Sequence, residues 1–154
     1  MNCSVLVVDD EVEIRQLLST MLTMMGYQSF TAEDGLDALE KIPECQPDIL
    51  ILDVMMPRMD GLTLCRKLRD SQETAALPII MLSGKAHQEA IREGLQAGAN
   101  RYLVKPTGLD ELTRNISEVL GEAAVSKAAV KKKRLFRNSG GVEALSGTCA
   151  ARPG

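Results

Sequence analysis

Polar residues that could do chemistry stand at the ends of four apolar runs in this 154-residue chain. They are Asp9 and Asp10 after residues 4–8, Asp53 after residues 49–52, Ser83 at the end of residues 79–83, and Lys105 at the end of residues 102–105. Carboxylates, a hydroxyl and an ammonium group, if they lay together, would suit a divalent cation and a phosphoryl group. The fold therefore has to bring the ends of these four runs to one place.

Three carboxylates in one crevice repel one another and raise each other's pKa values unless a cation joins them. Oxygen ligands from few protein groups favour Mg2+, which keeps several waters and often shares its site with phosphate oxygens. Lys105 and the Ser83 hydroxyl would supply a positive charge and a hydrogen-bond donor to a phosphoryl group on Asp53. Aspartate is a known nucleophile for phosphoryl groups and forms an aspartyl phosphate.

Each of these residues also has a structural explanation when it is taken alone. Asp9 or Asp10 could cap a helix, Asp53 could start a turn, Ser83 could satisfy a backbone group, and Lys105 could be a solvated strand end. Their common position at the ends of four strands favours a functional site over these separate explanations.

Hydrophobic periodicity predicts five strands that alternate with five helices. The strands are expected at residues 4–8, 27–32, 49–52, 79–83 and 102–105, and the helices at 14–25, 36–42, 62–68, 90–99 and 109–120. Residues 49–52 are apolar on both faces, which is typical of a central strand in a parallel sheet that helices cover on both sides. Pro43 is expected to close the second helix or to follow its end shortly.

The alternation predicts an α/β fold, a flavodoxin-like doubly wound parallel sheet with strand order 2-1-3-4-5 and right-handed crossovers. In this order the first, third, fourth and fifth strands are adjacent, and their carboxyl ends line one crevice. The second strand lies at the edge and contributes no comparable polar residue.

Composition and charge divide the chain into a body and a tail. Residues 1–125 carry 11 Lys or Arg against 20 Asp or Glu, a net charge of −9, whereas residues 126–154 carry 7 against 1, a net charge of +6. We expect one domain over residues 1–124 and a basic, largely disordered tail over 125–154, into which the last helix runs for a few turns. The tail is too short for a winged helix or an enzyme domain.

The apolar runs and the cysteines of the chain also bear on the location of the protein. No apolar run has the length of a membrane span, and the N-terminus opens into a strand rather than a signal peptide, so we expect a soluble cytoplasmic protein with no membrane insertion. The four cysteines lack metal-ligand spacing and are expected to be reduced.

Residues 4–121 resemble the receiver domain of two-component response regulators, and in particular a stand-alone receiver like the chemotaxis regulators. The motifs that carry the resemblance are Val7-Val8-Asp9-Asp10-Glu11, Leu52-Asp53-Val54-Met55-Met56-Pro57, Asp60-Gly61, Leu82-Ser83 and Leu103-Val104-Lys105-Pro106. The resemblance implies that Asp53 accepts a phosphoryl group from a partner's phosphohistidine. It also implies that Asp10, Asp53 and the Met55 backbone carbonyl hold Mg2+, with Asp9 assisting through bound water.

The resemblance further implies a conformational switch. Ser83 and Lys105 would contact the phosphoryl oxygens, the Lys105-Pro106 peptide bond would be cis, and Tyr102 would be the switch aromatic. Gly84 leaves room for that ring to move, although strand alternation also allows Tyr102 to be an ordinary core residue. The output surface would be the fourth helix, the fifth strand and the fifth helix.

Other classes of protein fit the sequence less well. A haloacid dehalogenase-type hydrolase needs a second acid two residues after the nucleophile, where this chain has Met55, and neither a dinucleotide-binding loop nor a P-loop is present. A flavin-binding protein would need aromatic residues that the chain lacks. A pseudo-receiver, a phosphorylation-independent interaction module, is the serious alternative, but it would be expected to have lost one of the acids or Lys105. We therefore expect a phosphoacceptor and not an enzyme; His87, the only histidine, is expected to be exposed rather than catalytic.

The partners implied are a sensor histidine kinase or histidine phosphotransfer protein as donor and a downstream protein target. Nucleic-acid binding is not expected, because no DNA-binding motif accompanies the basic residues 131–134. A phosphorylation-linked dimer remains open. The tail is hypothesised to aid partner binding while being dispensable for phosphoryl transfer.

Overall fold

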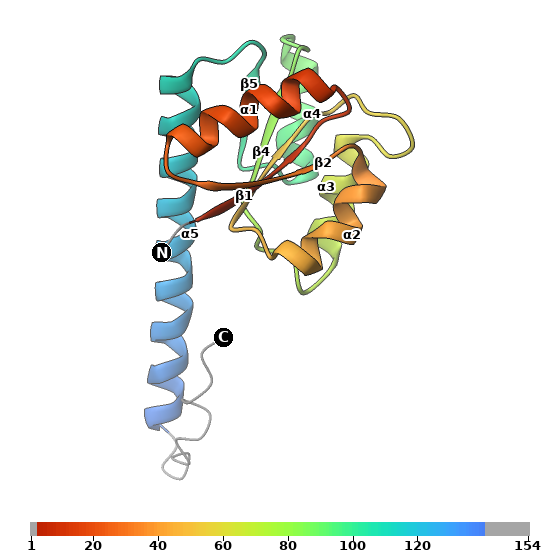
Figure 1. Cartoon of the computed structure of the whole chain (residues 1–154). Coiled ribbons are helices and arrows are strands. Elements are labelled where there is room, and N and C mark those ends of the chain that lie inside the picture. The colour runs from red at the N-terminus through yellow and green to blue at the C-terminus, as the bar shows by residue number, and fades with distance from the viewer. Residues whose placement is uncertain (1–2, 141–154) are drawn as a thin grey trace. The chain divides into compact units, whose positions relative to one another are not determined.

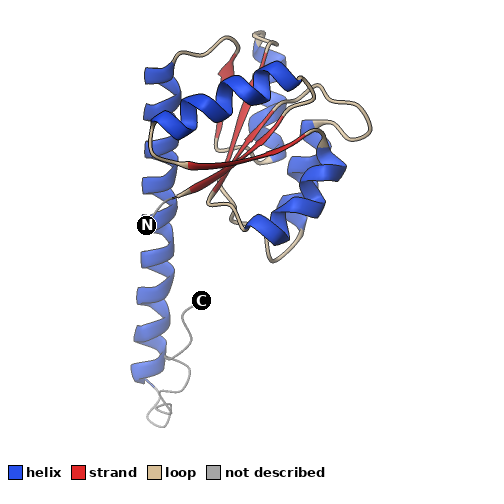
Figure 2. Cartoon of the chain, in the orientation of Figure 1, coloured by secondary structure: helices blue, strands red, loops and turns tan. Residues whose placement is uncertain are grey.

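The computed structural model describes residues 3–140, and it describes side chains as far as residue 126. The elements are β1 (Ser4–Val8), α1 (Val12–Met24), β2 (Gln28–Ala32), α2 (Gly35–Cys45), β3 (Ile49–Leu52), α3 (Gly61–Asp70), β4 (Ile79–Ser83), α4 (Gln88–Ala97), β5 (Arg101–Val104) and α5 (Leu109–Gly140). Strands and helices alternate along the whole of this order, as Figure 2 shows.

All five strands belong to one parallel sheet with the order β2-β1-β3-β4-β5. The predicted fold class, a flavodoxin-like sheet with order 2-1-3-4-5, is confirmed. β3 lies at the centre, and Ile49, Leu50, Ile51 and Leu52 are all at most 1% exposed. A strand buried on both faces needs apolar residues at every position, which is why its sequence does not alternate.

Helices cover both faces of the sheet (Figure 1), and a hydrophobic core lies on each face. Leu6, Leu50 and Met81 face a core shared with α2, α3 and the end of α4. The alternate residues of the same strands face a second core, which α1 and α5 complete with Leu22 and Ile116. The side-chain period of two along a strand sends successive residues to these two cores.

Side chains cap three of the helices. Asp34 accepts a hydrogen bond from Asp37 N at the start of α2, and Asp60 accepts one from Thr63 N at the start of α3. His87 caps α4 through its Nδ1, which accepts from Ala90 N at 3.2 Å. Each cap satisfies a backbone donor that the first turn of a helix leaves free. His87 is exposed, as expected, and has this structural role.

The prediction that Pro43 closes the second helix or follows its end is wrong, because Pro43 lies inside α2, which continues to Cys45. The helix ends at Gln46, which has a φ of 47° and caps it with a bond from its N–H to Ile42 O. The left-handed residue, rather than the proline, therefore terminates α2.

The last helix, α5, begins at Leu109 and continues to Gly140, so residues 125–140 of the expected tail are helical. The chain divides after Leu120 into two units, and the candidate site lies in the first. The expected domain boundary near residue 124 stays a prediction, and residues 141–154 lie outside the described residues.

Among residues 3–140, no helix combines the length and the apolar character that crossing a membrane requires. Cys3, Cys45 and Cys65 are free thiols, and Cys149 lies outside the described part of the chain.

Candidate functional site

Three carboxylates converge at the carboxyl ends of β1 and β3. Asp9, Asp10 and Asp53 each place a carboxylate oxygen within 4.8 Å of the others. Asp9 is 2% exposed and Asp53 is 6% exposed, whereas Asp10 is open to solvent. The neighbouring positions of β1 and β3 in the sheet bring these residues together from parts of the sequence more than 40 residues apart.

Lys105 reaches this cluster from the end of β5. Its Nζ donates to Asp9 Oδ2 at 2.8 Å and lies 3.6 Å from Asp53 Oδ1. Burial lowers the pKa of Lys105, but the hydrogen bond to Asp9 and the charges of Asp53 and Asp9 outweigh it, so the pKa is raised. The ammonium group therefore stays charged between the two buried carboxylates.

The surroundings of Asp53 disfavour its ionised form. Burial is the largest effect and raises its pKa, and the charge of Asp9 raises it further; together they bring it to about 6. Lys105 and a hydrogen bond from the Met55 backbone lower the pKa, and Asp10 adds a further small increase. One lysine thus leaves the three carboxylates with unbalanced negative charge. An added cation would relieve it, which makes this cluster a candidate metal centre.

Ser83 lies fully buried at the end of β4, which pairs with β5. Its Oγ accepts a hydrogen bond from Lys85 N at 3.2 Å, and its carbonyl accepts one from Lys105 N at 2.8 Å. Because the first bond uses an oxygen lone pair, the Ser83 O–H remains a donor. The Lys105–Pro106 peptide bond next to it is cis.

Tyr102 lies on β5, three residues before Lys105, and its ring lies against Gly94 of α4. Its hydroxyl donates to the Lys85 carbonyl at 2.9 Å, which ties β5 to the loop after Ser83. The half-buried ring packs against the core on that face of the sheet. A Cβ on Gly94 would come within 2.6 Å of the ring, so the glycine in α4 makes the space that the ring occupies.

The structure adds positioning residues that the sequence reasoning missed. Arg15 Nη1 donates to the Asp9 carbonyl at 2.6 Å and holds the turn between β1 and α1. Gly61 N donates to Val54 O at 2.8 Å, and a Cβ on Gly61 would collide with the backbone of Asp53. The Asp60-Gly61 pair signalled a turn in the sequence, but nothing there showed that the glycine lies against Asp53.

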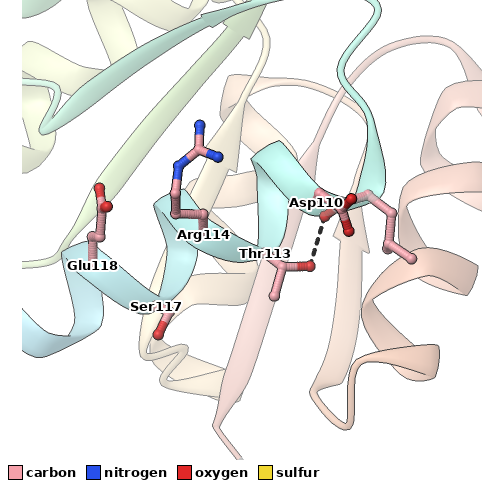
Figure 3. A pocket seen from close by; sticks show the side chains of 6 residues that line it. Asp110, Thr113, Arg114, Ser117 and Glu118 are labelled. Carbon is pink, nitrogen blue, oxygen red and sulfur yellow. Dashed lines mark hydrogen bonds between the residues drawn. The ribbon is translucent and has the colours of Figure 1, made fainter.

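A second hollow lies away from the carboxylates. It has a volume of about 430 Å³ and runs along one face of α5, lined by Leu109, Asp110, Thr113, Arg114, Ser117 and Glu118. In Figure 3 the labelled residues Asp110, Thr113, Arg114, Ser117 and Glu118 all come from a single helix. The Thr113 hydroxyl donates back to the Leu109 carbonyl. No residue of the carboxylate cluster lines this hollow.

The raised pKa of Asp53 predicts that Asp53→Asn stabilises the metal-free protein. A pKa of about 6 in the folded state, against about 3.9 in the unfolded chain, corresponds to about 3 kcal/mol at pH 7. The folded state holds the Asp53 proton more tightly than the unfolded chain does, so ionisation of Asp53 lowers the free energy of unfolding of the unsubstituted protein. This loss is absent below pH 4, grows as the pH rises, and is complete above pH 6. Urea unfolding with a chelator present should therefore show a gain of about 2 to 3 kcal/mol at pH 7 and none at pH 4.

Asp70→Asn is the matched control, because Asp70 is an exposed aspartate at the end of α3. It should change the free energy of unfolding by less than about 0.5 kcal/mol at both pH values. Equal changes in the free energy of unfolding for the two substitutions at pH 7 would show that the ionised Asp53 carboxylate does not destabilise the fold.

Comparison with known proteins connects this site to a family. The family model described as "Response regulator receiver domain" matches residues 5–117. Response regulator MprA of Mycobacterium bovis (strain BCG / Pasteur 1173P2) is 41% identical over 129 residues, which are 84% of this chain and 55% of that protein. The chain thus spans about half the length of this relative.

Solved structures agree with the sequence comparison. The chemotaxis protein CheY4 of Vibrio cholerae superposes with a TM-score of 0.73 at 36% identity, over 77% of this chain and 99% of that one. NtrX of Brucella abortus gives a TM-score of 0.80 at 30% identity, over 86% of this chain but 30% of NtrX.

Proposed function

The chain belongs to the response regulator receiver domain family, and from this we propose that it accepts a phosphoryl group on Asp53 in a Mg2+-dependent reaction. The observation that carries the proposal is the placement of the buried Asp53 carboxylate beside Asp9, Asp10 and the Lys105 ammonium. It supports the view of the protein as a phosphoacceptor rather than an enzyme with a separate substrate.

The residues present fit a divalent cation. The Lys105 ammonium pairs with two of the three carboxylates, those of Asp9 and Asp53. The pKa of Asp53 is still raised by burial and by the charge of Asp9, so the cluster carries excess negative charge. We propose Asp9, Asp10, Asp53 and the Met55 backbone carbonyl as the groups that would hold Mg2+, an ion that prefers such oxygen ligands. When bound, Mg2+ would neutralise the carboxylates and the charge of an incoming phosphoryl group.

The reaction we propose forms one bond and breaks one. An Asp53 carboxylate oxygen attacks the phosphorus of a phosphohistidine, the P–O bond forms, the P–N bond breaks, and the imidazole nitrogen leaves with the electron pair. Lys105 lies 3.6 Å from Asp53 Oδ1 and would pair with a phosphoryl oxygen. The Ser83 O–H would donate to another, since the oxygen rather than the hydrogen of this group is used in the bond from Lys85.

The donor we propose is a sensor histidine kinase or a histidine phosphotransfer protein, and the output is a downstream protein target. A pseudo-receiver is not favoured, because the acids and Lys105 are all present and lie together. The cytoplasmic location, the absence of nucleic-acid binding and the phosphorylation-linked dimer stay predictions.

Incubation with a small phosphodonor such as acetyl phosphate tests this function directly. Intact-mass analysis should show the gain of one phosphoryl group with Mg2+ present and little gain with a chelator, because the carboxylates otherwise repel the donor. Peptide mapping should place the group on Asp53. Absence of any gain at saturating Mg2+ would favour the pseudo-receiver.

Phosphorylation is also expected to alter the surface formed by α4, β5 and α5. A phosphoryl group adds about 1.5 to 2 negative charges and would draw the Ser83 hydroxyl toward it. Ser83 Oγ accepts a hydrogen bond from Lys85 N, and the Lys85 carbonyl accepts one from the Tyr102 hydroxyl. A shift of Ser83 would therefore move Lys85 and, through it, the Tyr102 ring.

Amide hydrogen exchange with and without phosphorylation should therefore differ over residues 83–115. A Tyr102→Phe variant, which lacks the bond to Lys85, should already exchange faster there in the unphosphorylated state. Identical exchange of the two phosphorylation states over these residues would contradict the proposed switch.

A further inference from the structure

The loop between β3 and α3 is held by an ion pair that the proposed reaction does not use. Arg58 Nε donates to Asp34 Oδ2 at 2.6 Å, across 24 positions of sequence. The Asp34 side chain is 5% exposed, and its other oxygen accepts from Asp37 N at the start of α2. The hydrogen bond from Arg58, more than any other effect, lowers the pKa of Asp34, so the pair is charged at neutral pH.

The backbone at Arg58 is strained. Its φ is 65°, a left-handed value that a residue with a Cβ adopts at a cost, and Met59 N donates to Pro57 O at 2.7 Å around it. A bond from residue i+2 to residue i with positive φ between them describes a γ-turn of the rare, strained kind. Such strain persists only where the surroundings enforce it.

The start of α2 supplies that enforcement at two points. Asp34 holds the Arg58 side chain, and Gly35 lies so close to the next loop residue that a Cβ would come within 2.8 Å of Met59 Cβ. The loop is thus fixed to α2 just beyond Met55, whose backbone carbonyl is one of the proposed metal ligands. Met55 itself is 58% exposed, so its own side chain does little to anchor this carbonyl.

We infer that Arg58 and Asp34 form a positioning pair, which holds the strained loop in the shape that presents the Met55 carbonyl to a divalent cation. This inference rests on the proposed function, because it assumes that the carboxylate cluster binds Mg2+. Neither residue touches the cation or the phosphoryl group. Their effect is on the geometry of a ligand, as with the residues around other metal sites that orient the ligands themselves.

The substitutions separate the ion pair from the backbone strain. Arg58→Gly removes the side chain but tolerates the left-handed φ, and Asp34→Asn removes the charge but remains a good helix cap. Each should raise the dissociation constant for Mg2+ about tenfold in calorimetric titration of the full chain with MgCl2. The double variant should be no worse than either single one, because the pair acts as a unit.

Arg92→Ala is the matched control, since it breaks an arginine–carboxylate pair of the same 2.6 Å length, to Glu89 on α4. It should leave Mg2+ affinity unchanged. Hydrogen exchange over residues 54–60 should be faster in Arg58→Gly and Asp34→Asn than in the control, with a chelator present.

Unchanged Mg2+ affinity in both single variants, with the unsubstituted protein binding Mg2+, would overturn this inference and leave the proposed function intact. A purely structural pair would give that result, with lower stability alone. Failure of the unsubstituted protein to bind Mg2+ would instead overturn the proposed function, and this inference with it.

Discussion

Asp53→Asn is expected to abolish the gain of a phosphoryl group from acetyl phosphate at saturating Mg2+. The amide keeps the shape of the carboxylate but is not a nucleophile at neutral pH, and it removes one charge from the proposed metal site. The fold should survive, because Asp53 lies at a strand end and its backbone N–H still donates to Val8 O. Intact-mass analysis of both proteins under the same conditions measures the difference.

Two controls make this experiment decisive. The first is the free energy of unfolding of the variant without metal, which should exceed that of the unsubstituted protein because the pKa of Asp53 is raised. A stable variant that gains no phosphoryl group has lost the acceptor and not the fold. The control Asp70→Asn should be phosphorylated at the unsubstituted rate. If Asp53→Asn still gains one phosphoryl group at that rate, the acceptor is another residue.

Gly61→Ala is expected to give the largest loss of stability among small substitutions near the site. A Cβ there would collide with the Asp53 carbonyl oxygen and come within 2.9 Å of Val54 Cα, and neither backbone atom can rotate away. Overpacking of this kind costs about 3 kcal/mol when only backbone can move. The free energy of unfolding in urea should fall by that amount, and Mg2+ affinity should fall with it, because any relief displaces Asp53.

Gly121→Ala provides the comparison within a helix. Nothing lies within 4 Å of a Cβ at Gly121, which is exposed on α5. Alanine is favoured over glycine in a helix by about 0.8 to 1 kcal/mol, so this variant should be unchanged or slightly more stable. A loss of less than about 0.5 kcal/mol in Gly61→Ala would mean that the loop after β3 can yield, contrary to the close packing described here.

The sequence by itself determined the fold class and the strand order, and it predicted which strand ends carry the candidate site. Apolar runs of four or five residues that alternate with helical periodicity permit few topologies, and right-handed crossovers reduce them further. The position of Asp53, Ser83 and Lys105 at strand ends then predicted their meeting, because parallel strands present their carboxyl ends at one edge. These features are readable because they are local or follow from general rules of connection.

The tertiary structure alone decided how the site is supported. The pairing of Arg58 with Asp34, the hydrogen bond of Arg15 to the Asp9 carbonyl and the contact of Gly61 with Asp53 join residues whose partners no spacing rule identifies. Pro43 likewise remains inside α2, where the sequence suggested an end. Such outcomes depend on which side chains and backbone atoms packing brings within a few ångströms of one another, and this distance is set by the whole fold rather than by any segment of it.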